Sequence, residues 1–300
     1  MIRIGVDMGG TKTEVAAIDS NGHTRYSVRE STPVQYETKI RLIASLVRST
    51  EESLGSDSLS VGVGHPGSIN PVTGLIRNSN SAQLNGKALD RDLVAALDRP
   101  VRCANDANCF ALSEAIDGAG QHAKSVFGVI IGTGVGGGLV LKGQLHEGHG
   151  LLGGEWGHTA LPWPSIDEVP GPLCKCGLSG CIESWIAGPA LTADHQRVSG
   201  ECLTGEHIVQ KAMAGDPHAT ATLDRFHDRL ARGLATIINI VDPEVIVLGG
   251  GLSNIPDLAG ETRLRLPDYV FSDQVTTRIV KNAHGDSSGV RGAAWLWPLP

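Results

Sequence analysis

The chain has 300 residues, of which 41% are hydrophobic and 19% charged, and 39 are glycine. This composition supports a sizeable core and excludes disorder as the main state. The formal net charge of -7 does not favour nucleic acid or anionic lipid as a partner, so a small molecule is expected. With no run of about 18 apolar residues and no signal sequence, we predict a cytoplasmic protein that binds no membrane.

The first 118 residues show strand patterns followed by alternating helices and strands. Apolar alternation and helical spacing predict, in chain order, strands at 2–7, 13–18 and 24–28, a helix at 36–54, a strand at 59–64, a helix at 90–97, a strand at 101–104 and a helix at 107–116. Asp106 precedes the last of these helices and is a candidate for its N-cap.

The opening pattern of strand, glycine turn and strand recurs from residue 125. The elements expected there are strands at 126–131 and 139–141 around a glycine-rich turn, then a helix at 219–241, a strand at 245–248 and a helix at 287–297. The recurrence predicts two α/β halves of similar plan, with a nucleotide in a cleft between them.

The two glycine turns are candidate phosphate loops. Gly132–Gly137 matches the dinucleotide fingerprint, but a strand follows where that fingerprint requires a helix, and no P-loop motif occurs. Backbone N–H groups of both turns, together with the hydroxyls of Thr11 and Thr133, could hold phosphates. An ordinary tight hairpin is the alternative for each turn.

Charged residues accompany the first turn. Asp7 ends a strand expected to be buried, where a carboxylate suits Mg²⁺-nucleotide binding or an Asx-type turn. Lys12 could neutralise phosphate charge or simply be solvated.

Asn105-Asp106 lies where a strand gives way to a helix, the edge at which α/β proteins bind ligands. A kinase that phosphorylates an alcohol needs one carboxylate aimed at the attacking hydroxyl to take its proton. Asp106 is therefore a candidate general base as well as a candidate cap.

One histidine and three cysteines have the spacing of a metal site. His158 is followed by Cys174, Cys176 and Cys181, and a His/Cys₃ set can close a tetrahedral zinc site of a structural kind. Unligated thiols are the alternative. Glu155 and Glu183 flank this segment and could accept hydrogen bonds from sugar hydroxyls, although a solvated glutamate is the simpler interpretation of either alone.

Taken together and in order, these motifs resemble the ROK family of sugar kinases. The resemblance spans essentially the whole chain and is carried by Asp7-x-Gly9-Gly10-Thr11-Lys12, Asn105-Asp106, Gly132-Thr133-Gly134, Glu155-x-x-His158, Cys174-x-Cys176-Gly177-x-x-Gly180-Cys181-x-Glu183 and Gly249-Gly250-Gly251.

The resemblance implies an actin-like α/β fold of the ribonuclease H and hexokinase type, with two domains that close on ATP and a hexose, usually as a homodimer. The domains expected are residues 1–118 with 284–300, which hold the first phosphate loop and Asp106, and residues 119–283. The resemblance makes Asp106 the base, with sugar contacts from Asn105, Glu155, His158 and Glu183. It assigns zinc to His158, Cys174, Cys176 and Cys181, the phosphates to Gly9–Lys12 and Gly132–Gly134, and the adenosine side to Gly249–Gly251.

Within that family, four further stretches are most similar to bacterial fructokinases, also called mannofructokinases. They are residues 66–71, 78–86, 154–158 and 284–297, and they add Gly67 and Asn80 as sugar contacts. We therefore expect Mg²⁺- and ATP-dependent phosphorylation of D-fructose to fructose 6-phosphate. Kinases of N-acetylglucosamine, glucose or mannose from the same family are the alternatives. A sugar-responsive repressor is disfavoured because the chain is acidic and shows no helix-turn-helix before its first strand.

Overall fold

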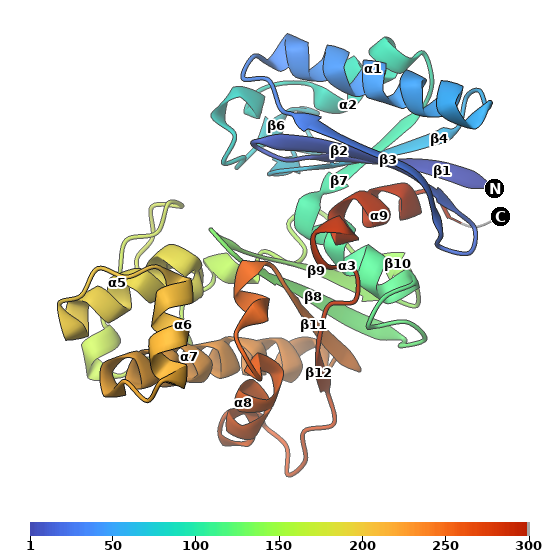
Figure 1. Ribbon diagram of the computed structural model, residues 1–300. Coiled ribbons are helices and arrows are strands. Elements are labelled where there is room, and N and C mark those ends of the chain that lie inside the picture. Colours follow the sequence, from blue (N-terminus) through green and yellow to red (C-terminus); the bar gives the residue numbers. More distant parts are fainter. Residues whose placement is uncertain (299–300) are drawn as a thin grey trace. The chain divides into compact units, whose positions relative to one another are not determined.

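The computed structural model describes residues 1–298. Packing divides them into two compact units. The colours of Figure 1 follow the sequence and do not mark the units. The first unit comprises Met1–Lys124, Gly138–Gly154 and the segment that begins at Ala283, and the second comprises Ser125–Gly137 and Glu155–Asn282. Because each is built around its own sheet, each is described by itself.

The first unit contains a five-stranded sheet of order β3-β2-β1-β4-β7. Its strands are β1 (Ile2–Met8), β2 (Lys12–Asp19), β3 (Thr24–Ser31), β4 (Ser60–His65) and β7 (Val101–Asn105). The first three form an antiparallel meander, whereas β1, β4 and β7 run parallel. A small antiparallel pair, β5 (Ser68–Ile69) and β6 (Ile76–Arg77), follows β4. The carboxyl ends of three parallel strands therefore share one edge of the sheet.

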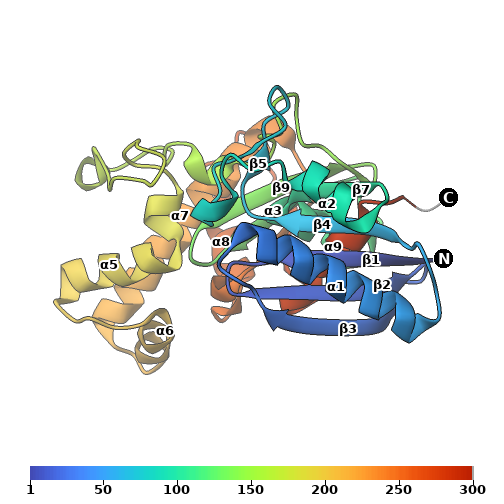
Figure 2. The ribbon, with the colours of Figure 1, turned by 90° about the horizontal axis from the view of Figure 1, so that it is seen from above.

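Helices cover both faces of this sheet (Figures 1 and 2). On one face lie α1 (Tyr36–Leu54) and α2 (Leu89–Leu97), and on the other α3 (Asp106–Ile116) and α9 (Ser288–Trp295). Side chains alternate along β1: Ile4, Val6 and Met8 join the core beneath α1 and α2, so Gly5 and Asp7 face α9.

Glycine lets α9 approach closely. A Cβ at Gly5 would lie 1.9 Å from the carbonyl oxygen of Val290, and one at Gly62 would lie 1.9 Å from that of Ala293. On its other side, α9 meets α3, where a Cβ at Gly292 would lie 1.6 Å from the Cys109 oxygen. The C-terminal helix is thus seated between the sheet and the helix that begins at Asp106.

The second sheet has the order β10-β9-β8-β11-β12, which repeats the plan of the first. Its strands are β8 (Ser125–Ile131), β9 (Val135–Leu141), β10 (Gln144–Leu145), β11 (Val245–Gly249) and β12 (Arg278–Lys281). Strands β8, β11 and β12 run parallel, and β10 pairs antiparallel with β9. The division between the compact units passes through β9.

The second unit has its own set of α-helices. They are α4 (Glu183–Ile186), α5 (Gly188–Ser199), α6 (Gly205–Met213), α7 (Pro217–Val241) and α8 (Leu258–Arg265). Short 3₁₀ helices in the chain span Ala82–Leu84, Trp156–His158, Ile166–Glu168, Gly251–Asn254, Leu266–Asp268 and Gly285–Ser287. No helix within residues 1–298 is both long and apolar enough to cross a membrane.

The predicted fold class is confirmed, and each of the predicted strands and helices is present. The sequence patterns missed α5, α6, α8 and β12, which pack in the second unit. The cap of α3 is Asn105 rather than Asp106, because the Asn105 side chain accepts a hydrogen bond from the Ala107 N–H.

The compact units differ from the expected domains in one respect. Residues 119–124 and 138–154 group with the first unit, whereas the sequence boundaries place them in the second domain. The domain assignment itself remains a prediction, and residues 299 and 300 of the expected first domain lie outside the described residues.

Candidate active site

The first unit presents Asn105 and Asp106 at the carboxyl edge of its sheet. Asn105 ends β7, and its side chain both caps α3 and donates a hydrogen bond through Nδ2 to the Gly67 carbonyl, 3.0 Å away. Asp106 is the first residue of α3 and is exposed, with Oδ1 2.8 Å from the Ala107 N–H. A carboxylate at a helix N-terminus is stabilised in its charged form. The arrangement suits an accessible base that is held in place by the start of α3.

Asp7 lies on the same side of the sheet, at the end of β1. Its pKa is raised to about 7, first by burial and then by the neighbouring carboxylates of Asp106 and Glu14, while Arg29 opposes them. The space for this carboxylate depends on Gly289, because a Cβ there would lie 2.8 Å from Asp7 Oδ2. Carboxylates this close repel one another unless a cation lies among them, so the cluster is chemically suited to a Mg²⁺-nucleotide.

The first glycine turn joins β1 to β2. Gly10, Thr11 and Lys12 are exposed, so their backbone and side chains are accessible to a ligand. Thr32 holds the turn through two hydrogen bonds: its N–H donates to the Thr11 carbonyl at 2.9 Å and its hydroxyl to the Gly9 carbonyl at 3.0 Å. A Cβ at Gly9 would lie 2.7 Å from the Lys12 oxygen, so the bend is too tight for another residue.

Gly67 and Asn80, the two further predicted sugar contacts, belong to the same unit. Gly67 has a φ of +81°, and a Cβ there would lie 2.5 Å from the Arg77 carbonyl. Asn80 is exposed and follows Ser79, which is held by two hydrogen bonds to the Asn85 side chain at 2.9 Å each. Both loops are therefore ordered by contacts close to the predicted sugar ligand Asn105.

The sequence analysis missed a small pocket next to Asn105. Its walls are formed by His65, Ser68, Ile69, Cys103, Ala104, Asn105, Asn108, Glu147 and Leu151. Burial lowers the pKa of His65 to about 4, and burial also raises the pKa of Glu147 against a hydrogen bond from Asn108. Among the described residues, His65 Nε2 and Asn108 Oδ1 have no hydrogen-bond partner. The pocket thus combines polar and apolar side chains, and only the His-Pro-Gly sequence that begins with the last residue of β4 could have suggested it.

The second glycine turn joins β8 to β9 in the second unit. Thr133 is exposed at its tip, and the Gly132 N–H donates to the Gly134 carbonyl at 2.9 Å. The Gly249–Gly251 turn follows the neighbouring strand β11, and a Cβ at Gly250 would lie 2.5 Å from the Ile131 carbonyl. The two turns predicted to hold the phosphate and adenosine parts of a nucleotide therefore lie side by side.

The predicted sugar ligand Glu183 is bonded to this second turn. Its Oε2 atom accepts a hydrogen bond from the Val135 N–H at 2.9 Å, and Lys175 Nζ lies 3.1 Å from Oε1. Glu155, by contrast, is exposed at the start of the 3₁₀ helix Trp156–His158. Sugar binding by either glutamate remains a prediction.

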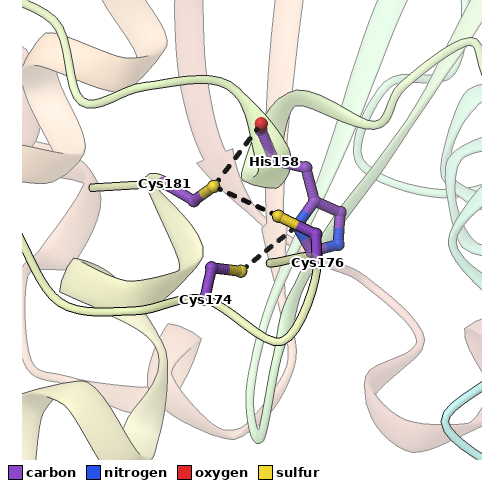
Figure 3. A group of neighbouring side chains, drawn as sticks. All are labelled: His158, Cys174, Cys176 and Cys181. Carbon is purple, nitrogen blue, oxygen red and sulfur yellow. Dashed lines mark hydrogen bonds between the residues drawn. The ribbon is translucent and has the colours of Figure 1, made fainter. Parts of the chain in front are cut away.

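The four predicted metal ligands come together in the second unit (Figure 3). One donor atom from each of His158, Cys174, Cys176 and Cys181 lies within 4.8 Å of the others. His158 Nδ1 is 3.5 Å from Cys174 Sγ, and Cys176 Sγ is 3.5 Å from Cys181 Sγ. Tetrahedral zinc, with bonds of about 2.0–2.3 Å, places its ligand atoms about 3.5–3.8 Å apart. The donor set and its spacing therefore fit zinc.

The thiols have different environments. Burial raises the pKa of Cys174, and burial likewise raises that of Cys181 to about 12, whereas the Leu178 N–H lowers the pKa of the exposed Cys176. Three thiolates next to one another require a cation to stay ionised, which a coordinated Zn²⁺ supplies. With four protein ligands, such a site would be structural.

The comparison with protein families decides the identity of the chain. A model described as the ROK family matches residues 3–299. The chain belongs to the ROK family. The resemblance inferred from the motifs is thereby confirmed.

Individual ROK relatives cover nearly the whole chain. An N-acetyl-D-glucosamine kinase from Yersinia enterocolitica is 38% identical over 297 residues, covering 97% of this chain and 98% of the relative. The crystal structure of a ROK hexokinase from Thermus thermophilus has a TM-score of 0.87 and 31% identity, covering 98% and 97% of the two chains. A ROK glucokinase from Streptomyces griseus, in complex with glucose and AMPPNP, has a TM-score of 0.80 and 26% identity, covering 99% of both.

The substrate named for curated relatives differs from the predicted fructose. Those from Yersinia enterocolitica and Pasteurella multocida carry the name N-acetyl-D-glucosamine kinase, a function that the sequence had offered as an alternative. The comparisons therefore support that alternative better than fructose.

Proposed function

We propose that this ROK protein transfers the γ-phosphoryl group of ATP to a hydroxyl group of a hexose. The observation that supports the proposal most strongly is the pair Asn105-Asp106, held at the sheet edge by the cap of α3 and the Gly67 carbonyl. The family membership and the glucose and AMPPNP bound by the Streptomyces griseus relative support it independently.

In the proposed reaction, Asp106 accepts the proton of the attacking sugar hydroxyl. Its carboxylate is exposed at the first residue of α3 and is therefore accessible to a sugar hydroxyl. Asn105, the residue before Asp106, is one predicted sugar contact. The other predicted sugar contacts are Gly67, Asn80, Glu155, His158 and Glu183. The sugar then gains the phosphoryl group and ATP leaves as ADP.

The nucleotide is assigned to the two glycine turns. Backbone N–H groups of Gly9–Lys12 and Gly132–Gly134 would bind the phosphates, and Gly249–Gly251 would lie along adenosine. Asp7 would help to hold Mg²⁺, because its carboxylate lies near those of Asp106 and Glu14, and the ion would supply positive charge to the phosphates. Zinc on His158 and the three cysteines would pin the segment between Glu155 and Glu183.

We propose N-acetyl-D-glucosamine as the leading substrate because the curated relatives with that name match 97% of this chain. D-fructose is the second candidate, since residues 66–71, 78–86, 154–158 and 284–297 resemble fructokinases. A homodimer remains the predicted assembly.

The proposal is tested by ADP release with N-acetyl-D-glucosamine, D-fructose, D-mannose and D-glucose at saturating Mg²⁺-ATP. The leading substrate should give the highest kcat/KM. A higher value for D-fructose would restore the fructokinase hypothesis without affecting the kinase. No sugar-dependent ADP release with any of the four, from protein that contains zinc, would contradict the proposed function.

A further inference from the structure

Both segments that supply zinc ligands also contact the first residues of β9, directly after the second glycine turn. Glu183 follows Cys181 and accepts the buried Val135 N–H at 2.9 Å. Trp156, two residues before His158, donates its Nε1–H to the Gly136 carbonyl at 3.0 Å. The start of β9 is therefore held from two directions by the chain on either side of the metal cluster.

Tight packing leaves these contacts little freedom. A Cβ at Gly157 would lie 2.4 Å from the Val135 carbonyl, and one at Gly134 would lie 2.7 Å from Glu183 Oε2. Because there is no room for one further carbon atom between Gly157 and Val135 or between Gly134 and Glu183, a shift of either segment towards the turn has to move residues 134 and 135 as well.

The two segments are joined to each other at the metal cluster. The Ile182 N–H donates to the Thr159 carbonyl and the Leu161 N–H to the Gly180 carbonyl, each at 2.9 Å. In Figure 3, His158 and Cys181 approach one another from these two segments, and Cys181 Sγ is 3.6 Å from the His158 carbonyl. A zinc ion bound here would close the junction from which both contacts to β9 extend.

The remaining partners of Glu183 come from the cysteine loop itself. Lys175 Nζ lies 3.1 Å from Oε1, and Cys174 Sγ lies 3.9 Å from the same oxygen. Lys175 is 55% exposed, whereas Glu183 is buried. The carboxylate thus links the cysteine loop on one side to the Val135 N–H on the other, and the lysine is the more peripheral of the two contacts.

We propose that Glu183 is a positioning residue that holds the Gly132–Gly134 turn in the shape that binds nucleotide phosphates, and that the zinc cluster sets nucleotide affinity through it. This inference rests on the proposed function, and it gives Glu183 a role separable from sugar binding. A glutamate that only contacts the sugar would leave nucleotide affinity unchanged when no sugar is present.

The test measures Mg²⁺-ATP affinity by isothermal titration calorimetry without sugar, together with zinc content and melting temperature. Glu183→Ala should weaken Mg²⁺-ATP roughly tenfold or more, as expected when a hydrogen bond to a charged group is lost, while zinc stays bound. Glu183→Gln should restore affinity to within about threefold of the wild type, since its amide oxygen can still accept the Val135 N–H. Chelation of zinc from the wild type should weaken Mg²⁺-ATP in the same direction as Glu183→Ala.

Lys175→Ala is the matched control, because it removes the exposed partner of Glu183 and keeps the bond to Val135. It should bind Mg²⁺-ATP within about twofold of the wild type. If zinc-loaded Glu183→Ala binds Mg²⁺-ATP as the wild type does, or if Glu183→Gln is as weak as Glu183→Ala, the positioning role is wrong. Failure of the wild type itself to bind Mg²⁺-ATP would contradict the proposed function instead. Should Glu183→Ala fail to fold, the zinc-depleted wild type decides the matter: weaker Mg²⁺-ATP binding supports the proposal, and unchanged binding contradicts it.

Discussion

The two glycine turns occupy the same place in two sheets of the same strand order, yet they are supported in different ways. Thr32 holds the first turn, Gly9–Lys12, from the residue directly after β3. The second turn, Gly132–Gly134, is followed by Val135, which is bonded to Glu183, 48 residues further along the chain. Repetition of the sheet thus determined where each turn lies, while its support came from unrelated parts of the chain.

The charges near the turns differ as well. The first turn follows Asp7, whose pKa is raised by burial and by the carboxylates of Asp106 and Glu14. Near the second, Glu183 lies against Lys175, and Cys174 Sγ of the candidate zinc cluster is 3.9 Å from its Oε1. If both proposals hold, the first unit supplies the acidic groups of the reaction and the second relies on a metal to keep its turn in shape.

The largest effect should come from Asp106→Asn, which removes the proposed base of the first unit. We expect kcat to fall by on the order of 10²–10⁴, since general bases contribute about that much. Affinity for Mg²⁺-ATP and melting temperature should change little, because Asn105 provides the cap of α3. Steady-state kinetics with calorimetry would check this, and near-normal turnover would exclude Asp106 as the base.

Loss of zinc should weaken the second unit specifically. Cys176 is exposed, so Cys176→Ser removes a candidate ligand without leaving a buried cavity. Any change in melting temperature therefore reports on the metal. We expect bound zinc to be lost and the melting temperature to fall by roughly 5–10 °C. Cys202→Ser, at an exposed cysteine outside the cluster, is the control and should alter neither quantity. If wild-type protein purified without zinc had the same melting temperature as the zinc-loaded protein, the second unit would not depend on a metal for its stability.

A smaller effect, confined to the first unit, should come from Asp7→Asn when stability is followed against pH without Mg²⁺ or nucleotide. The folded-state pKa of Asp7 is raised to about 7 from 3.8, so the folded protein holds a proton that the unfolded chain releases. The stability that this proton confers is complete below about pH 4 and is lost as the pH rises through 7. As the pH rises over that range, the free energy of unfolding of Asp7→Asn should therefore increase relative to that of the wild type, by on the order of 1–4 kcal/mol.

Asp19→Asn supplies a control of opposite sign for the pH series. A backbone hydrogen bond from His23 lowers the pKa of Asp19, so its stabilising effect is present at neutral pH and is lost on acidification. Urea titrations at about pH 2, pH 4 and pH 8 would separate the two variants, because the Asp7 effect is lost between pH 4 and pH 8 and the Asp19 effect below about pH 4. Equal stability of Asp7→Asn and wild type at pH 4 and at pH 8 would show that Asp7 is ionised without cost.

Local patterns predicted the first sheet, strands β8, β9 and β11 of the second, and helices α1, α3 and α7, since alternation and helical spacing are read over a few residues. The cluster of four candidate zinc ligands was also predictable, because three of them are close in sequence and chemically distinctive. The helices α5, α6 and α8 were missed, and the α8 sequence Leu-Ala-Gly-Glu-Thr-Arg-Leu-Arg shows why: only Leu258 and Thr262 of that helix are buried, too few to form an apolar stripe.

The sequence by itself determined the kinds of element, the glycine turns, the metal ligands and the ROK family. Only the tertiary structure showed that Glu183 accepts the Val135 N–H and that His65 and Glu147 line one pocket. It also showed that α9 packs directly against Gly5. Turns and strands follow from local backbone preferences, which each short stretch of sequence carries. Contacts between residues far apart in the chain depend on how whole elements pack, and no local pattern encodes which partner a buried carboxylate will find.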